Sequence, residues 1–434
     1  MVSFIGILLG LVLFIALAYR GHNLVLSAIG CSCVMLILSG KGALSGLNEL
    51  YLPGLAQFVQ DYLLLFIFSA LLGRLMSDGG SAKRIALSLA RVICKREKNQ
   101  KFYSILLVAV LYFVLCYVGI TGFVVVFTVL PIAKDLFQRT DTPWRLYSCG
   151  GAQTIVSIFL VGSLQAGNLY ATDVCGTTLN AAPLISIVSV VVFQAVYLVM
   201  LHITARRAET QGEGFLPSGE GILNTEVNEG LPEERLPSLP LSLFPLAVVL
   251  FLATGLGLPV EPVLCLGCLL TVLVCWPNLR PILRSSLSQG VIASTNPVLG
   301  VAATYAIGVV IRSLEGFTYF EALLGQLPPL AQGCGLGFLA SFIMASSTAP
   351  IPAFGSQMLE HFTATGLSPE LAHRMMTITS FSSMAPHNAG ISNAATVLKL
   401  PYASCLKLYV IFTYIPGICA LLASCAVLLL TATS

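Results

Sequence analysis

A run of polar residues interrupts an apolar part of the chain, in the stretch "SSMAPHNAGISNAA" at 382 to 395. Proline and glycine interrupt helices, and histidine and asparagine can hydrogen-bond to a ligand or to the backbone groups that the interruption leaves free. Histidine also titrates near neutral pH. His387, Asn388 and Asn393 could therefore hydrogen-bond a ligand as neutral groups, and His387 could also take up and release a proton.

Three further polar interruptions occur elsewhere in the chain: "YVGITG" at 117 to 122, "VGSLQAGN" at 161 to 168 and "ASSTAP" at 345 to 350. Apart from one histidine, the polar side chains at these breaks are neutral donors and acceptors. Together they predict one site for a small polar ligand, with no catalytic residue and no metal ligand. The predicted binding residues are Thr121, Ser163, Gln165, Asn168, Ser347, Thr348, His387, Asn388 and Asn393, and His387 is also predicted to couple protons.

The elements that position these residues are membrane helices. The chain has 434 residues, of which 56% are hydrophobic and only 9% charged, whereas about a quarter of the residues of soluble proteins are charged. The formal net charge of +3 comes with no basic patch interleaved with aromatics, so nucleic acid is not a predicted partner. The 13 cysteines lie mostly singly in apolar runs, which favours packing over metal binding or disulfides.

Apolar runs long enough to cross a bilayer, about 20 residues each, predict the simple spans. These lie near 3 to 19, 23 to 39, 60 to 77, 184 to 204, 240 to 256, 261 to 278, 291 to 313 and 404 to 431. The remaining apolar segments contain the four interruptions. Residues 101 to 137 and 328 to 362 each predict a re-entrant hairpin with a polar tip, and residues 145 to 181 and 369 to 398 each predict a helix broken near its middle.

The order of these elements repeats. Each half predicts three spans, a surface helix, a hairpin, a broken helix and a final span, with the surface helices near 73 to 90 and 308 to 327. The two halves, 1 to 204 and 240 to 434, are joined by a polar linker at 205 to 239. Five full crossings per half is an odd number, so the second half is predicted to enter the membrane with the opposite orientation. The fold class is thus an all-α polytopic membrane protein with two inverted-topology repeats.

The distribution of basic residues supports this topology. With the surface helix after "GRLMSDGG" and its basic end "KREKNQK" on the cytoplasmic side, only Lys41, Arg312 and Arg374 of the 22 Lys and Arg fall on the outer side. We therefore expect a multi-pass membrane protein with both termini outside and the linker, 205 to 239, in the cytoplasm.

Inverted repeats with broken helices are the plan of many secondary transporters, which hold substrate near the membrane midplane. Unsatisfied backbone groups cannot face lipid, so the four breaks are expected to line one cavity. Their half-helix N-termini favour an anion. No Lys or Arg lies at the centre of a predicted span, so we expect helix ends and neutral donors, rather than an ion pair, to hold the anion.

The chain resembles the gluconate permease (GntP) family of the ion transporter superfamily along essentially its whole length. The resemblance is carried by "FIGILLGLVLFIALAYRGHNLVLSAIG" at the start, "GRLMSDGGSAKRIA", "GFVVVFTVLPIAKDLF", "GTTLNAAP" and "ELAHRMMTITSFSSMAPHNAGI". It implies a proton-coupled symporter of the cell (inner) membrane that carries hydroxylated carboxylates such as gluconate and works as a homodimer by an elevator mechanism. The proline-histidine-asparagine motif of the family falls on Pro386, His387 and Asn388.

The sequence departs from the family where the substrate would bind. Family members often have a Gly-Thr-Pro sequence at the first break, where this chain has "VGSLQAGN", and "AGI" follows the motif here in place of "GAV". The resemblance therefore implies the type of transporter more firmly than its substrate.

Other functions are consistent with parts of the sequence. The main alternative is a sodium-coupled carboxylate or dicarboxylate symporter, because clusters of Ser, Asn and free carbonyls also bind sodium. A cation/proton antiporter normally needs a buried carboxylate, and none lies at a span centre. An intramembrane enzyme is disfavoured because the chain has neither a GxSxG elbow nor an HExxH pair, so we expect no enzymatic activity and no cofactor besides the coupling ion.

Overall fold

The computed structural model describes residues 2–20, 22–93, 99–223 and 231–432. Within these ranges the chain is helical, with no strand. Five helical segments are long and apolar enough to cross a membrane: Ala43–Asp78, Gln100–Tyr117, Pro183–Thr210, Leu283–Ser313 and Tyr402–Leu430. Large apolar side chains cover the outside of these helices, for example Leu184, Ile187 and Val191 on one of them. The prediction of an all-α polytopic membrane protein is therefore confirmed.

The simple spans form helices close to the predicted ranges. They are α1 (Val2–Tyr19), α2 (Leu24–Leu38), α4 (Leu52–Asp78), α10 (Pro183–Thr210), α12 (Leu239–Leu250), α13 (Val260–Val274), α15 (Leu283–Ser313) and α21 (Tyr402–Ala432). Some limits differ. Short α3 (Ala43–Gly46) and a π-helical turn (Leu47–Tyr51) extend α4 upstream, a second π turn (Phe251–Gly255) follows α12, and the predicted span to 278 divides into α13 and α14 (Trp276–Leu279).

Both predicted hairpins are helix pairs with non-helical tips. The first consists of α6 (Gln100–Tyr117) and α7 (Gly122–Arg139), and the second of α17 (Pro329–Met344) and α18 (Pro350–Thr363). The helices of each pair pack against each other. Gly119 in the first tip has a φ of +93° and Ala345 in the second has a φ of +44°, so both tips turn through left-handed backbone.

In both segments predicted to be broken helices, the helix is interrupted at the polar motif. The first begins as a 3-10 helix (Trp144–Ala152), continues as α8 (Gln153–Phe159) and resumes after 160–165 as α9 (Ala166–Cys175). The second consists of α19 (Pro369–Thr379), a 3-10 turn (Ser380–Ser383) and, after 384–388, α20 (Ala389–Leu398). The long 3-10 start was not predicted. It packs tightly, since a Cβ on Gly151 would lie 2.1 Å from the ring of Tyr409.

Two short helices stand where surface helices were predicted, α5 (Ser81–Ile93) and α16 (Phe317–Leu324). The basic segment "KREKNQK" that follows α5 lies largely outside the described residues. Asp78 ends α4, where its carboxylate pairs with Arg74 at 2.7 Å and accepts a hydrogen bond from Ser286 Oγ at 2.7 Å. The linker contains α11 (Glu220–Leu223) and a 3-10 turn (Glu233–Arg235).

The same order of elements occurs in both halves, from α1 to α10 and from α12 to α21. The long helices pack in corresponding pairs, α4 along α15 and α10 along α21. Contacts between the halves also come in exchanged pairs: α2 packs on α15 and α13 on α4, while α7 packs on α20 and α18 on α9. The inverted relation of the halves stays a prediction.

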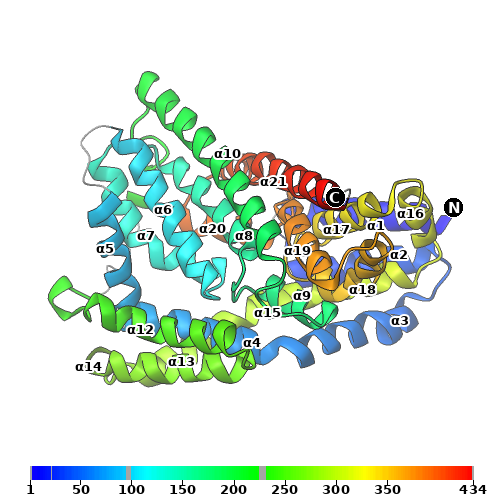
Figure 1. Ribbon diagram of the computed structural model, residues 1–434, viewed down its shortest axis with the longest axis horizontal. Helices are drawn as coiled ribbons and strands as arrows, with labels where there is room; N and C mark the ends of the chain where they lie inside the picture. Colours follow the sequence, from blue (N-terminus) through cyan, green and yellow to red (C-terminus); the bar gives the residue numbers. More distant parts are fainter. Residues whose placement is uncertain (1, 21, 94–98, 224–230, 433–434) are drawn as a thin grey trace.

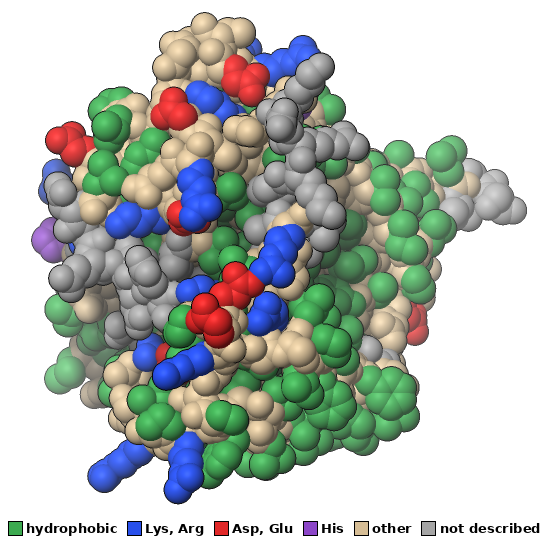
Figure 2. All heavy atoms as spheres, turned by 90° about the vertical axis from the view of Figure 1, so that its left-hand side faces the viewer, with side chains coloured by type: hydrophobic (Ala, Val, Ile, Leu, Met, Phe, Trp, Pro, Cys, Tyr) green, Lys and Arg blue, Asp and Glu red, His purple; other side chains and the backbone are tan. Residues whose placement is uncertain are grey.

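Basic side chains are spread over one end of the molecule. In Figure 1 the chain ends lie toward the right, whereas α5, α14 and the linker lie at the left. Figure 2 shows this left end face on, with Lys and Arg side chains spread across it between Asp and Glu. Ion pairs join the linker to the helices here, Arg91 and Arg84 with Glu233 and Arg145 with Glu213.

Candidate substrate cavity

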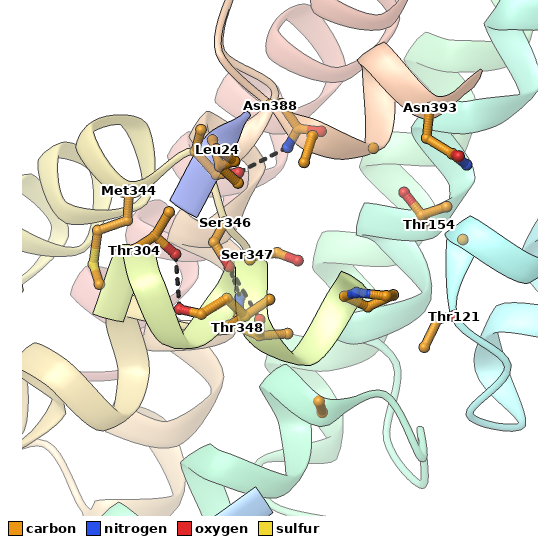
Figure 3. Close-up of a pocket in the computed structure, with 18 of the residues that line it drawn as sticks. Leu24, Thr121, Thr154, Thr304, Met344, Ser346, Ser347, Thr348, Asn388 and Asn393 are labelled. Atoms are coloured by element: carbon orange, nitrogen blue, oxygen red, sulfur yellow. Dashed lines mark hydrogen bonds between the residues drawn. The ribbon is translucent and has the colours of Figure 1, made fainter. Parts of the chain in front are cut away.

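A cavity of about 690 Å³ lies where the hairpin tips and the two helix breaks meet. Its wall is completed by residues of α2, α4, α15 and α21, so both halves of the chain contribute to it. Figure 3 shows Ser346, Ser347 and Thr348 of the second tip, Thr121 of the first and Asn388 of the second break arranged around a common space. The four interruptions, distant in sequence, therefore meet at one place.

Most of the predicted binding residues line this cavity, and two do not. The residues at the wall are Thr121, Gln165, Ser347, Thr348, His387, Asn388 and Asn393. Ser163 and Asn168 are fully buried within the protein and are absent from the wall. Seven polar residues that were not among the nine also line it: Asn23, Ser69, Tyr112, Thr154, Thr304, Ser346 and Tyr409. A single hydroxyl in an apolar helix carries little signal, because it often bonds its own backbone, as Thr304 does to Val301 O.

Four helices begin at the cavity wall. The lining includes Gly122 at the start of α7, Ala166 at the start of α9, Thr348 just before α18, and Ala389 and Gly390 at the start of α20. A helix start carries N–H groups without an intrahelical partner and a partial positive charge of about half an elementary charge, although α18 has fewer such groups because Pro350 and Pro352 lack an N–H. No Lys, Arg, Asp or Glu lines the cavity among the described residues. The groups at the wall itself are therefore helix ends and neutral side chains, and they favour an anion.

Side-chain amides tie each helix break to the neighbouring hairpin tip. In the first half, Gln165 Nε2 donates to Cys116 O at 2.7 Å, and the backbone N–H of Leu164 donates to Tyr117 O at 3.0 Å. Tyr117 in turn donates its hydroxyl to Val161 O at 2.9 Å. The free carbonyls at the end of α6 are thus paired with the first break.

The second half uses a comparable arrangement. Asn388 Nδ2 donates to Ala345 O in the tip and to Ser383 O at the end of the 3-10 turn, both at 2.9 Å, while its Oδ1 accepts from the N–H of Ile391 at 3.0 Å. Gln165 and Asn388 occupy similar positions, because both precede the second half-helix and both bond a hairpin tip. Asn168 shares another feature with Asn388, since the Nδ2 of each donates to the carbonyl five residues earlier.

One ring nitrogen of His387 is hydrogen-bonded to the protein, and the other has no such partner among the described residues. Its Nε2 lies 2.9 Å from Ile343 O, and because a carbonyl only accepts, Nε2 must carry a hydrogen. The ring is 1% exposed and contacts the rings of Phe14 and Phe342 edge-on. Nδ1 has no hydrogen-bond partner among the described residues. Any change of protonation at His387 must therefore occur at Nδ1.

A buried polar network lies behind the first break, and sequence reasoning missed it. Arg374 and His373 of α19 are fully buried and both bond Asn168 Oδ1, Arg374 through Nη1 at 3.0 Å and His373 through Nε2 at 2.8 Å. Arg374 was placed on the outer face of the membrane. The structure instead places it in the protein interior, where it donates to the carbonyls of Phe159 and Ala181.

Comparisons with known proteins support a relationship to a transporter and indicate neither a substrate nor a coupling ion. No known family model matches the chain. It is 25% identical to an uncharacterized transporter of Bacillus subtilis (strain 168), YxjC, over 442 aligned positions that cover 91% of this chain and 92% of that protein. With the cavity and the apolar helices, this similarity shows a multi-pass membrane protein related to a transporter.

Proposed function

We propose that the protein is a secondary active transporter that carries a small organic anion by proton-coupled symport. One observation carries the proposal: four helix N-termini meet at a cavity whose wall holds neutral polar side chains and no charged one among the described residues. Such a wall attracts a carboxylate through backbone N–H groups without placing a cation in direct contact with the cavity.

The substrate class that fits is a hydroxylated monocarboxylate of the gluconate type. Helix starts would take the carboxylate, while Thr121, Ser347 and Asn393 would bond hydroxyl groups. Apolar lining residues such as Leu65, Phe66 and Met344 exclude water from the rest of the wall. The family resemblance points to the same class, and the changes at the first break leave the individual sugar acid or hydroxy acid open.

His387 is the proposed coupling residue. Its Nε2–H donates to Ile343 O, so Nδ1 would accept a hydrogen bond from a substrate hydroxyl when neutral and donate one to the substrate carboxylate when protonated. Ile343 belongs to the second hairpin. The side chain of His387 would therefore connect the second break with this hairpin and also contact the substrate. The anion and the proton would therefore bind to the cavity together.

Alternating access would result from movement of the hairpins and broken helices of both halves relative to the other helices. The recurring element order and the exchanged contacts between halves support inverted repeats, and the bonds between tips and breaks support their movement as a unit against α4 and α15. We place the protein in the cell inner membrane as a homodimer, with both termini outside and the basic end of Figure 2, including linker 205–239, in the cytoplasm.

A thermal-shift screen of the purified protein tests the anion preference. Gluconate, lactate, citrate and succinate would each be compared with the corresponding neutral amide. We expect a carboxylate of the gluconate type to raise the melting temperature and its amide to do so far less. Equal stabilisation by a carboxylate and its amide would contradict an anion site.

Sodium coupling is the second candidate, and the same screen addresses it. Several break carbonyls that would coordinate sodium already accept hydrogen bonds, including those of Cys116, Ser163, Ala345 and Ser383. Each of these hydrogen bonds uses one of the two lone pairs of its carbonyl oxygen, which leaves fewer acceptor positions for sodium and supports proton coupling. Stabilisation by gluconate that requires sodium at constant pH would instead favour the sodium-coupled symporter.

A further inference from the structure

Arg374 is a cation enclosed in the protein without an acidic partner. It lies on α19 and is fully buried, and no carboxylate lies within 4.0 Å of it in the described part of the chain. Its guanidinium donates to Ala181 O at 2.9 Å, to Asn168 Oδ1 at 3.0 Å and to Phe159 O at 3.1 Å. The hydrogen-bonding capacity is therefore used, while the positive charge is not neutralised.

The neighbouring histidine does not share this charge. Asn168 Oδ1 can only accept, so His373 Nε2, 2.8 Å away, must be the donor. His373 Nδ1 lies 2.7 Å from Thr177 Oγ1, which can donate to it. The neutral imidazole thus satisfies both contacts. Arg374 is the one cation of this network.

The guanidinium is connected to the cavity by a short path. Asn168 lies in the first turn of α9, two residues after Ala166, which lines the cavity. Its Nδ2 donates to Ser163 O at 2.8 Å, and the next two residues of that break, Leu164 and Gln165, also line the cavity. Arg374 therefore lies directly behind the wall from which the N-terminus of α9 meets the cavity.

We propose that Arg374 is a positioning residue that, through Asn168, fixes the first helix break and supplies the cavity with a permanent positive potential that favours an anion over the matching neutral molecule. This inference rests on the proposed function. A cation placed behind the wall attracts the anion without contacting it, so it keeps its carbonyl partners whether the cavity is full or empty. At a separation of about 10 Å and an effective dielectric constant of about 20, one unit charge changes the affinity for an anion by roughly tenfold or more.

The substitution Asn168→Asp tests the charge without removing the guanidinium. The new carboxylate would neutralise Arg374 where Asn168 Oδ1 now accepts its hydrogen bond. The matched control is Asn168→Ala, because both variants lose the bond to Ser163 O and only Asn168→Asp adds the negative charge. Dissociation constants for gluconate, or for whichever screened carboxylate stabilises the wild type most, would be measured by thermal-shift titration of the full-length protein.

We expect Asn168→Asp to bind the carboxylate roughly tenfold more weakly than Asn168→Ala, with no difference between the two variants in binding its amide. Arg374→Lys should retain much of the wild-type affinity, and Arg374→Gln should lose it. Ser186→Ala removes another donor to Phe159 O without changing any charge, so it should lower thermal stability and leave the preference for the carboxylate over the amide unchanged.

Equal carboxylate affinity in Asn168→Asp and Asn168→Ala would overturn the inference and leave the proposed function standing. If Arg374→Gln merely lowered stability as Ser186→Ala does, with the preference for carboxylate retained, the charge would have no role. A wild-type protein that no carboxylate stabilises would contradict the proposed function itself, and the inference with it.

Discussion

At the scale of single residues, the site is built from side chains that do two tasks. Gln165 and Asn388 pair backbone carbonyls at the hairpin tips, and they also line the cavity. His387 does the same through Nε2 and keeps Nδ1 free. A change at any of these positions should therefore alter both the stability of a break and the contact with a ligand.

His387 allows these two tasks to be separated. In His387→Gln the amide nitrogen can still donate to Ile343 O, but the side chain cannot carry a proton near neutral pH. We expect this variant to bind the carboxylate and to lose its proton-driven accumulation, whereas His387→Ala should lose both. Binding would be followed by thermal shift and accumulation by uptake into proteoliposomes. Uphill uptake by the Gln variant under a proton gradient would remove His387 from the coupling.

Asn388 should matter more for stability than Asn393. Asn388→Ala leaves the carbonyls of Ala345 and Ser383 and the N–H of Ile391 without their present partner, at a cost of about 1 to 3 kcal/mol for each buried group. Asn393→Ala removes a side chain from the cavity wall and should affect binding with little loss of stability. Thermal unfolding in detergent measures both. Similar melting temperatures for the two variants would argue against the bonds between tip and break.

At the scale of elements, glycine, proline and polar residues made the interruptions predictable. "YVGITG" and "ASSTAP" fall at the two tips, and "GSLQAGN" and "APHNAG" fall at the two breaks. Residue types along one segment do not show which groups face each other across helices. For this reason Asn168 was expected in the cavity and Arg374 at the outer face, whereas each is buried against the other.

The first hairpin tip depends on the backbone conformation of Gly119. Its φ is +93°, and a Cβ there would lie 3.2 Å from Leu164 O in the facing break. Gly119→Ala should therefore destabilise the tip by about 1 to 2 kcal/mol or more and reduce uptake. Gly257 is a matched control, since its φ is +64° and a Cβ added there would meet nothing within 4 Å. Gly257→Ala should lose some stability and keep uptake, and equal uptake by both variants would contradict a role for the tip.

At the scale of the whole molecule, basic residues concentrated at one end set the proposed orientation. The linker is joined to that end by Glu213 and Glu233, which pair with arginines of the helical body. The start of α1 and the end of α21 lie toward the other side of the view in Figure 1. Composition predicted the polytopic all-α fold, because it is a property of the chain that needs no knowledge of packing, and the orientation drawn from the basic residues stays a prediction.

Single cysteines on the two sides would test this orientation. In a background without native cysteines, Lys41→Cys should react with a membrane-impermeant maleimide in intact cells. Glu234→Cys, in the linker, should react only after the membrane is permeabilised, because both residues are exposed but are predicted on opposite sides. The reverse pattern would invert the topology, and labelling of both in intact cells would contradict it.

The central claim is that the cavity at the four breaks moves a small organic anion together with a proton. The most direct measurement is uptake of radiolabelled gluconate and related hydroxycarboxylates into proteoliposomes that contain the purified protein, without sodium and with an imposed inward proton gradient. We predict accumulation above the external concentration that collapses with a protonophore and is absent from His387→Ala. No accumulation of any carboxylate tested, or accumulation that follows a sodium gradient and ignores the proton gradient, would contradict the claim.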